Sequence, residues 1–422
     1  MNAEILTIGD ELLRGEIVDT NKSYLADRLL ELDIETRFQT SVRDDPADMI
    51  DAFRSAAGRS DITLVSGGLG PTRDDLTSAV LGEAFGLELV LDEPTLEGIR
   101  GFFRARGREM TPNNASQALF PKGAEILPNP LGTAPGFAIA QGVTRFFCMP
   151  GVPNEMTRMM EEQVMPRLAA LERGGRVVRA RLLRTFGIGE SALDDELKDI
   201  ATAGEVSLGF RTAFPDNYLR PLVRAASAEQ AEAALERVCA AIRERLGAFV
   251  YGEGDQSLDA VVGELLVARG LRLAVAESCT GGWIAKRITD NPGSSAYFAG
   301  GVVAYSDAAK CELLGVSRAS LAAHGAVSDA VAREMAEGAR ARFGADIAIA
   351  TTGISGPGGA TAGKPVGLVH LALARDGATH SDAFVFRMDR ARHRQLTAQV
   401  ALDWVRRTLI GAELAGPTWA QR

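Results

Sequence analysis

Glycine-rich turns follow short apolar segments at several places along this 422-residue chain. The segments 3–8, 62–65, 144–149 and 271–276 are apolar and have the length of strands, and each is followed by a turn and a helical pattern. Strands that alternate with helices form a largely parallel sheet with helices on both faces. In such sheets the turns after the strands bind ligands. The sequence therefore predicts an α/β protein whose chemistry lies in these turns.

The order of these patterns predicts three regions. Residues 1–172 form a first α/β domain with a parallel-type sheet, and residues 257–415 form a second one. Between them, residues 173–251 form a small α+β module that has no glycine-rich phosphate loop of its own. The polar stretch 252–257 is the predicted linker.

Charge, hydropathy and cysteine content exclude several classes of protein. The 46 Lys and Arg against 55 Asp and Glu residues give a net charge of −9, which disfavours direct binding to nucleic acid. No apolar run approaches the roughly 18 residues of a membrane span, and we expect no signal peptide and no membrane partner. The cysteines form no C-x-x-C pair, which favours a reducing, cytoplasmic location. They are Cys148, Cys239, Cys279 and Cys311.

Histidine is confined to the last hundred residues or so of the chain, from His324 onward. The preceding three quarters can therefore build neither a Ser-His-Asp triad nor a histidine-ligated metal site by themselves. A nucleophile in that part of the chain needs another base, and a lysine whose pKa is lowered by burial can serve.

The loop after the strand 271–276 carries candidate nucleophiles. Ser278 and Cys279 both lie where the strand gives way to a helix, and backbone N–H groups at such a helix start can receive an oxyanion. Lys310, in the next βα unit, is the candidate base. The alternative is that the glycines after Thr280 only allow tight strand–helix packing, with the hydroxyls capping the helix.

Five motifs in this half of the chain resemble the C-terminal domain of the CinA (competence/damage-inducible) family. In chain order they lie at residues 276–282, 301–306, 324–328, 352–357 and 364–367. The resemblance implies an amidohydrolase that converts nicotinamide mononucleotide to nicotinate mononucleotide and ammonia.

The resemblance also implies roles for individual residues. Ser278 would be the nucleophile and Lys310 its base, with Tyr305 and Thr352 as further active-site residues. Arg390 would suit the 5′-phosphate, because a guanidinium binds phosphate bidentately. Tyr305 as a core aromatic and Arg390 as a solvated charge are the alternatives. The predicted substrate-binding residues of this domain are Arg390, Thr280, Gly281 and Gly353.

The first domain resembles the molybdopterin-binding domain that CinA proteins carry. The matching motifs lie at residues 8–15, 19–21, 66–75, 132–136 and 150–156. In this family the domain is implicated in metal-dependent ADP-ribose pyrophosphatase activity. Its predicted substrate-binding residues are Gly67, Gly68, Gly70, Thr72 and Asn21.

Two carboxylates of this domain, Asp44 and Asp75, are predicted to hold a divalent metal ion. Oxygen ligands suit a hard ion and pyrophosphate chemistry. Asp74 is explained as well by a favourable charge at a helix start. The resemblance leaves a monovalent cation as a further candidate and implies no organic cofactor.

The residues and the resemblance together predict a bifunctional enzyme of pyridine-nucleotide salvage, acting on nicotinamide mononucleotide and ADP-ribose as a homodimer. One alternative is an adaptor in DNA uptake or repair that binds a pterin or nucleotide without turnover. Another is a molybdopterin transferase, in which Ser278 would have no role.

Overall fold

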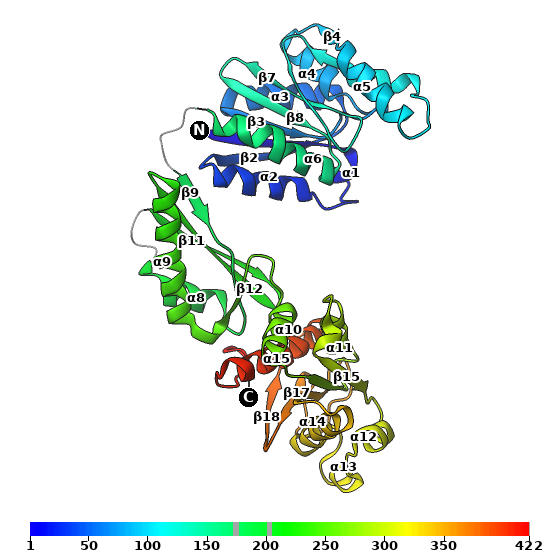
Figure 1. Cartoon of the computed structure of the whole chain (residues 1–422), viewed down its shortest axis with the longest axis vertical. Coiled ribbons are helices and arrows are strands. Elements are labelled where there is room, and N and C mark those ends of the chain that lie inside the picture. The colour runs from blue at the N-terminus through cyan, green and yellow to red at the C-terminus, as the bar shows by residue number, and fades with distance from the viewer. Residues whose placement is uncertain (172–176, 201–204, 422) are drawn as a thin grey trace. The chain divides into compact units, whose positions relative to one another are not determined.

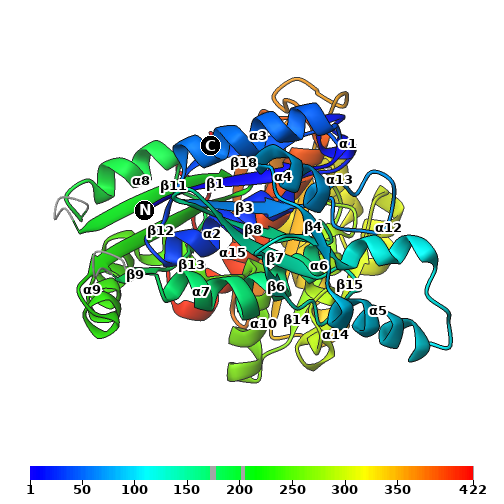
Figure 2. The same ribbon diagram turned by 90° about the horizontal axis from the view of Figure 1, so that it is seen from above.

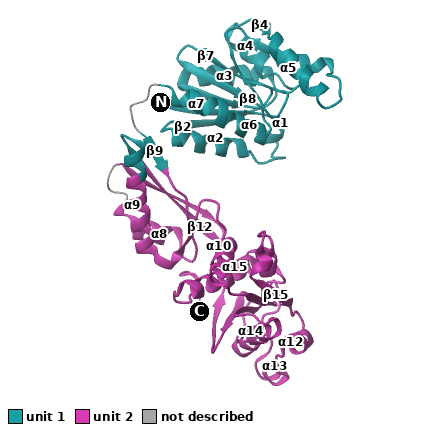
Figure 3. Ribbon diagram, in the orientation of Figure 1, with its two compact units in different colours: residues 1–179, 224–232 teal, residues 180–223, 233–422 magenta. Residues whose placement is uncertain are grey.

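The computed structural model describes residues 1–171, 177–200 and 205–421. The predicted boundary between residues 172 and 173 lies outside these ranges, and the domain limits remain predictions. By their contacts the residues divide into two compact units (Figure 3). The first unit holds residues 1–179 and 224–232, and the second holds residues 180–223 and 233–422.

The first unit is built on a six-stranded sheet with the order β2-β1-β3-β8-β7-β6 (Figure 1). Its strands are β1 (Asn2–Ile8), β2 (Glu35–Val42), β3 (Ile62–Ser66), β6 (Glu125–Leu127), β7 (Gly136–Gln141) and β8 (Thr144–Met149). A second small sheet pairs β4 (Leu89–Leu91) with β5 (Leu119–Pro121). The helices are α1 (Asp10–Leu13), α2 (Thr20–Glu31), α3 (Pro46–Arg59), α4 (Thr77–Phe85), α5 (Glu93–Arg104), α6 (Pro153–Met159) and α7 (Met165–Ala169).

Both faces of this sheet are covered by helices, as the sequence predicts (Figures 1 and 2). Side chains of a strand alternate between its two faces. Leu6 and Ile8 of β1 therefore pack with α3 and α4, whereas Ala3 and Ile5 pack with α2 and α6.

The middle module contains a sheet with the order β11-β12-β10-β13. The bounds of its elements are β9 (Val177–Ala180), β10 (Leu183–Thr185), α8 (Glu190–Leu197), β11 (Val206–Ala213), β12 (Asp216–Ala225), α9 (Ala228–Leu246) and β13 (Val250–Glu253). The observed mixture of strands and helices agrees with the α+β class that the sequence predicts for this module.

The C-terminal part of the second unit contains a five-stranded sheet with the order β15-β14-β16-β17-β18. Its strands are β14 (Leu273–Glu277), β15 (Phe298–Val303), β16 (Ile347–Gly353), β17 (Leu368–Arg375) and β18 (Ala378–Val385). Its helices are α10 (Leu258–Arg269), α11 (Trp283–Thr289), α12 (Asp307–Leu314), α13 (Arg318–His324), α14 (Asp329–Phe343) and α15 (Arg390–Ile410).

The α/β class is confirmed, but each large sheet also has antiparallel strands. The strands β14, β15 and β16 are parallel, whereas β17 and β18 continue the sheet in antiparallel pairing. In the first unit β7 likewise pairs in antiparallel fashion with both of its neighbours, β6 and β8. These strands follow their neighbours through turns rather than helices, so the alternation of strands and helices did not predict their direction.

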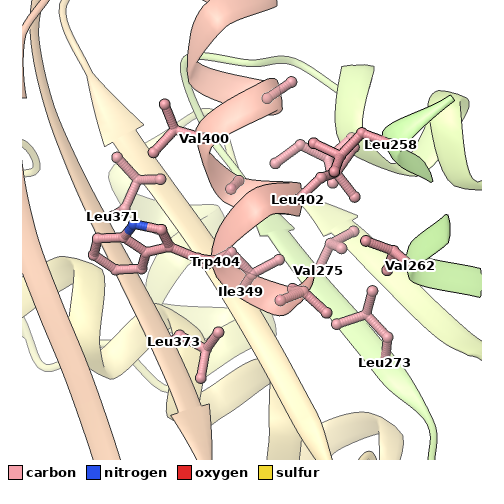
Figure 4. Packing of buried hydrophobic residues seen from close by; sticks show 14 of the residues in the cluster. Leu258, Val262, Leu273, Val275, Ile349, Leu371, Leu373, Val400, Leu402 and Trp404 are labelled. Carbon is pink, nitrogen blue, oxygen red and sulfur yellow. The ribbon is translucent and has the colours of Figure 1, made fainter. Parts of the chain in front are cut away.

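The core of the C-terminal part is formed by two layers of side chains. Leu273 and Val275 of β14 pack against α10 and α15, where Trp404 is fully buried (Figure 4). Ala274 and Ala276 point to the other face and pack against α14. Because β14 is buried on both faces, only its ends are open to ligands.

Part of the middle module shares this core. Phe186, which is 2% exposed, and Tyr251 belong to the same hydrophobic cluster as Trp404. Leu193, by contrast, lies in the module's separate cluster with α9.

Among the helices that the structure describes, none combines the length and apolar character needed to cross a bilayer.

The shared core predicts different effects for two substitutions in the module. Phe186→Ala should lower the unfolding free energy of the C-terminal part by about 3–5 kcal/mol, because it opens a cavity in that core. All three tryptophans (Trp283, Trp404 and Trp419) lie in this part, so tryptophan fluorescence in urea reports its unfolding. Leu193→Ala is the control, and it should shift the urea midpoint of this fluorescence transition less than Phe186→Ala does. Equal shifts would contradict a shared core.

Candidate active sites

The C-terminal site lies where three neighbouring parallel strands end. Glu277 of β14 is opposite Val303 of β15 on one side and Thr351 of β16 on the other. The residues that follow these positions therefore meet at one edge of the sheet. The Ser278 N–H donates to the Thr351 carbonyl at 3.0 Å, which ties the candidate nucleophile loop to β16.

Ser278 and Lys310 are in direct contact. The Lys310 Nζ lies 3.2 Å from the Ser278 Oγ and donates to the Ala304 carbonyl at 2.9 Å. Ser278 is 9% exposed and Lys310 only 1%. Burial lowers the pKa of Lys310 from its ordinary value, because desolvation disfavours the ammonium form. A neutral amine that contacts a serine hydroxyl can accept its proton.

Cys279 is the less suitable nucleophile. Its thiol is buried, and this burial raises its pKa to about 12. The thiol therefore stays protonated near neutral pH, and the thiolate is the reactive form. The hydrogen bond from Lys310 goes to Ser278.

A carboxylate of the chain already occupies the start of α11. Glu277 is fully buried, and its carboxylate accepts hydrogen bonds from Ile284 N at 3.1 Å and Ala285 N at 2.8 Å. The expectation that the start of this helix receives an oxyanion is therefore wrong for these two N–H groups. Oxyanion donors for this site must therefore be groups other than these two.

Tyr305 and Arg390 are 85 residues apart in sequence but lie together. The Arg390 Nη2 donates to the Tyr305 hydroxyl at 3.3 Å, and its Nη1 donates to the Gly356 carbonyl at 2.9 Å. Tyr305 is 64% exposed, so it is not a core aromatic. Arg390 is not a freely solvated charge either, since it joins two loops of the candidate site.

Other predicted residues of this site make structural contacts. The Thr352 Oγ1 donates to the Ala326 carbonyl at 2.8 Å, and the buried Thr280 hydroxyl pairs with that of Thr351. At Gly353 a Cβ would lie 2.7 Å from the Leu368 carbonyl oxygen, so packing alone requires a glycine. Gly281 has a φ of +61°, which favours glycine in this tight loop.

Arg394 also belongs to this site and was not predicted. Its Nη2 donates to the Thr280 carbonyl at 2.8 Å, and its guanidinium lies 5.4 Å from the Trp283 ring centre. It follows Arg390 by four residues on α15, which places both on one side of the helix. That spacing was the signal available in the sequence.

The N-terminal site is a cavity of about 570 Å³ in the first unit. The loop after β3 lines it with Gly67, Gly68, Gly70 and Thr72, as predicted. Gly67 has a φ of +117°, and a Cβ there would lie 2.3 Å from the Ile8 carbonyl oxygen, so this loop requires glycine.

Asn21 lies beside this cavity rather than in its wall. It lines a smaller cavity of about 90 Å³, and its Nδ2 donates to the Ser66 Oγ at 2.9 Å and the Gly151 carbonyl at 2.8 Å. These bonds connect α2 to the ends of β3 and β8. Asn21 therefore supports the loops that form the larger cavity.

Several carboxylates face the larger cavity. Burial raises the pKa of Asp44, and the nearby charges of Glu11, Asp10 and Asp74 raise it further, whereas a hydrogen bond from the Asp10 backbone lowers it. A cation would relieve this repulsion. The Asp75 Oδ2 accepts bonds from the Thr72 N and Oγ1, at 2.8 and 2.6 Å.

The described residues contain no group of three or more His, Cys, Asp or Glu side chains arranged to hold a metal ion. Asp44 and Asp75 both line the cavity, and carboxylate oxygens are the kind of ligand that Mg²⁺ takes. Such an ion is commonly held by one or two carboxylates together with the phosphates of the substrate.

Sequence profiles of known families cover most of the chain. The CinA C-terminal domain matches residues 255–409, the probable molybdopterin binding domain matches residues 4–170, and the damage-inducible protein CinA KH domain matches residues 180–252. A CinA-like protein of Anaeromyxobacter sp. (strain Fw109-5) is 47% identical over 413 residues, which cover 97% of this chain and 99% of that protein. This chain belongs to the CinA family.

Other CinA proteins are similar too. A CinA-like protein of Geobacter sulfurreducens is 44% identical over 98% of this chain and 100% of its own length. The crystal structure of a CinA protein of unknown function from Thermoplasma acidophilum is 35% identical, with a TM-score of 0.37, over 39% of this chain and 96% of that one.

The Ser278–Lys310 contact predicts a reactive serine. A fluorophosphonate should modify Ser278, and more quickly as the pH rises through the lowered pKa of Lys310, since only the neutral amine accepts the proton. Lys310→Met should slow this labelling by about 10²–10⁴-fold. Cys279→Ala is the control and should be labelled like the parent. Peptide mass spectrometry identifies the modified residue; label on Cys279 would contradict the assignment.

Proposed function

We propose that this CinA protein hydrolyses the carboxamide of nicotinamide mononucleotide to give nicotinate mononucleotide and ammonia. The observation that carries the proposal is the contact of the Lys310 Nζ with the Ser278 Oγ at 3.2 Å in a buried setting. A binding protein or adaptor has no need of a desolvated lysine against a serine hydroxyl, whereas amide hydrolysis needs a nucleophile and a base.

In the first half of the proposed reaction, the Ser278 Oγ attacks the carboxamide carbon and its proton passes to Lys310. The tetrahedral oxyanion needs hydrogen-bond donors, and the N–H groups of Cys279 and Thr280 in the loop ahead of α11 are the candidates. Lys310, now an ammonium, donates the proton to the leaving nitrogen as the C–N bond breaks. Ammonia departs, and the nicotinoyl group remains as an ester on Ser278.

In the second half, Lys310 is neutral again and takes a proton from water. The resulting hydroxide attacks the ester carbon, and the Ser278 Oγ leaves with the proton that Lys310 returns. Arg390 would bind the 5′-phosphate of the substrate, and its hydrogen bond to Tyr305 holds both side chains at the same edge of the sheet.

The test of this proposal is ammonia release from nicotinamide mononucleotide by the purified chain and by Ser278→Ala. The parent should turn over, and the folded variant should lose at least about 10³-fold, because the nucleophile is absent. A parent that is inactive over a range of pH and salts would contradict the proposal and favour the adaptor. A variant that keeps its rate would exclude Ser278 as the nucleophile.

A second activity, metal-dependent cleavage of ADP-ribose, is proposed for the first unit. Its support is the combination of backbone amides at residues 68–70 with carboxylates in one cavity of about 570 Å³. Asp44 and Asp75 would hold a divalent ion, which when bound would offset the charge of the pyrophosphate. The amides of the glycine-rich loop would hold the phosphate oxygens.

The homodimer remains a prediction.

The release of AMP and ribose 5-phosphate from ADP-ribose tests this second activity. It is measured once with Mg²⁺ and once with a chelator. The chelator should abolish cleavage, and Asp75→Asn or Asp44→Asn should lower it at least about tenfold, because each removes a ligand charge. Asp51→Asn, an exposed residue on α3, is the matched control and should cleave like the parent. Tight pterin binding without cleavage would favour the molybdopterin alternative.

A further inference from the structure

A tight turn of the middle module contacts the helix that carries Arg390. The strands β11 and β12 are joined by Phe214 and Pro215, and this turn lies against α15. The Phe214 carbonyl accepts a hydrogen bond from the Gln395 Nε2 at 3.3 Å. The guanidinium of Arg392 lies 5.4 Å from the centre of the Phe214 ring.

Asp216, directly after this turn, uses both carboxylate oxygens. The Oδ1 accepts a hydrogen bond from the Gln399 Nε2 on α15 at 2.5 Å, and the Oδ2 accepts one from the Tyr251 hydroxyl on β13 at 2.9 Å. The pKa of Asp216 is raised to about 6 because the effect of burial is the largest one. The two hydrogen bonds and the charges of Arg287 and Arg184 act in the opposite direction and only partly offset it. One acidic side chain therefore joins α15 to the module in a largely buried place.

The same half of α15 contacts the candidate amidase site. Arg390 donates to Tyr305 and Gly356, and Arg394 donates to the Thr280 carbonyl in the nucleophile loop. From Arg390 to Gln399 the helix rises about 14 Å. The contacts to the module and the contacts to the candidate site thus lie on the same three turns of α15. Because a helix is rigid over this length, a displacement of α15 at the module also displaces the side chains at the site.

We propose that Asp216 is a positioning residue of the amidase site: through Gln399 it holds the first turns of α15, and thereby Arg390 and Arg394, in register with the nucleophile loop. This inference rests on the proposed amidase function for its effect on turnover. Its structural part, the restraint of α15 by the hairpin, can be measured without substrate.

Hydrogen exchange of the full chain tests the restraint. In Asp216→Ala the amides of residues 390–399 and of the loop 278–282 should exchange about tenfold faster than in the parent, because the hydrogen bond that ties the Gln399 side chain of α15 to the module is lost. Gln399→Leu removes the partner donor and should give the same pattern. Asp216→Asn keeps an acceptor and should exchange close to the parent rate. Asp194→Asn, an exposed carboxylate on α8, is the matched control.

Steady-state kinetics distinguish positioning from stability alone. With nicotinamide mononucleotide, Asp216→Ala should raise KM about tenfold and change kcat less, since Arg390 would bind the phosphate. With nicotinamide riboside, which lacks the phosphate, KM should change little between parent and variant. Asp216→Asn should recover most of the parent KM.

Unchanged exchange over residues 390–399 in both Asp216→Ala and Gln399→Leu overturns the inference. Equal acceleration throughout the second unit also overturns it, because Asp216 would then be only a stabilising residue. If exchange changes as expected but the parent releases no ammonia, the amidase proposal fails and the restraint of α15 stands. If the parent is active and the KM values do not differ between variants, Asp216 does not position the site.

Discussion

Burial of the central strands on both faces is the constraint on which the two candidate sites depend. β14 packs against α15 with one set of side chains and against α14 with the other, and β1 is covered in the same way. Neither face of such a strand can contact a ligand. Polar groups that bind a ligand must therefore lie in the segment that follows the end of the strand. The nucleophile loop follows β14, and the glycine-rich loop of the first unit follows β3.

The same burial has opposite effects on two neighbouring groups. It lowers the pKa of Lys310 and raises that of Cys279, because in each case desolvation disfavours the charged form. The lysine thereby becomes a better proton acceptor and the thiol a poorer nucleophile. We propose Ser278 rather than Cys279 as the nucleophile because of these shifts and the contact of Ser278 with Lys310, whereas the loop sequence alone left the two open.

Much of the fold and part of the site could be predicted because the evidence for them is local. Apolar strands followed by glycine-rich turns predicted the α/β class, and the succession of two βα units brought Ser278 and Lys310 into one hypothesis. The contacts of Arg394, Glu277 and Asp216 could not be predicted. Each has a partner whose identity depends on packing: a loop carbonyl, two helix N–H groups, and an amide on a helix 183 residues away in sequence.

The sequence by itself determined where the candidate ligand-binding turns of this protein lie. Short apolar strands must be buried, and the glycines that follow them permit backbone conformations that other residues resist. Only the tertiary structure decided which groups meet at those positions and how their pKa values shift, because both depend on the surroundings of each group. Burial of Lys310, the occupation of the α11 start by Glu277 and the attachment of α15 to the middle module through Asp216 arise when distant segments pack together.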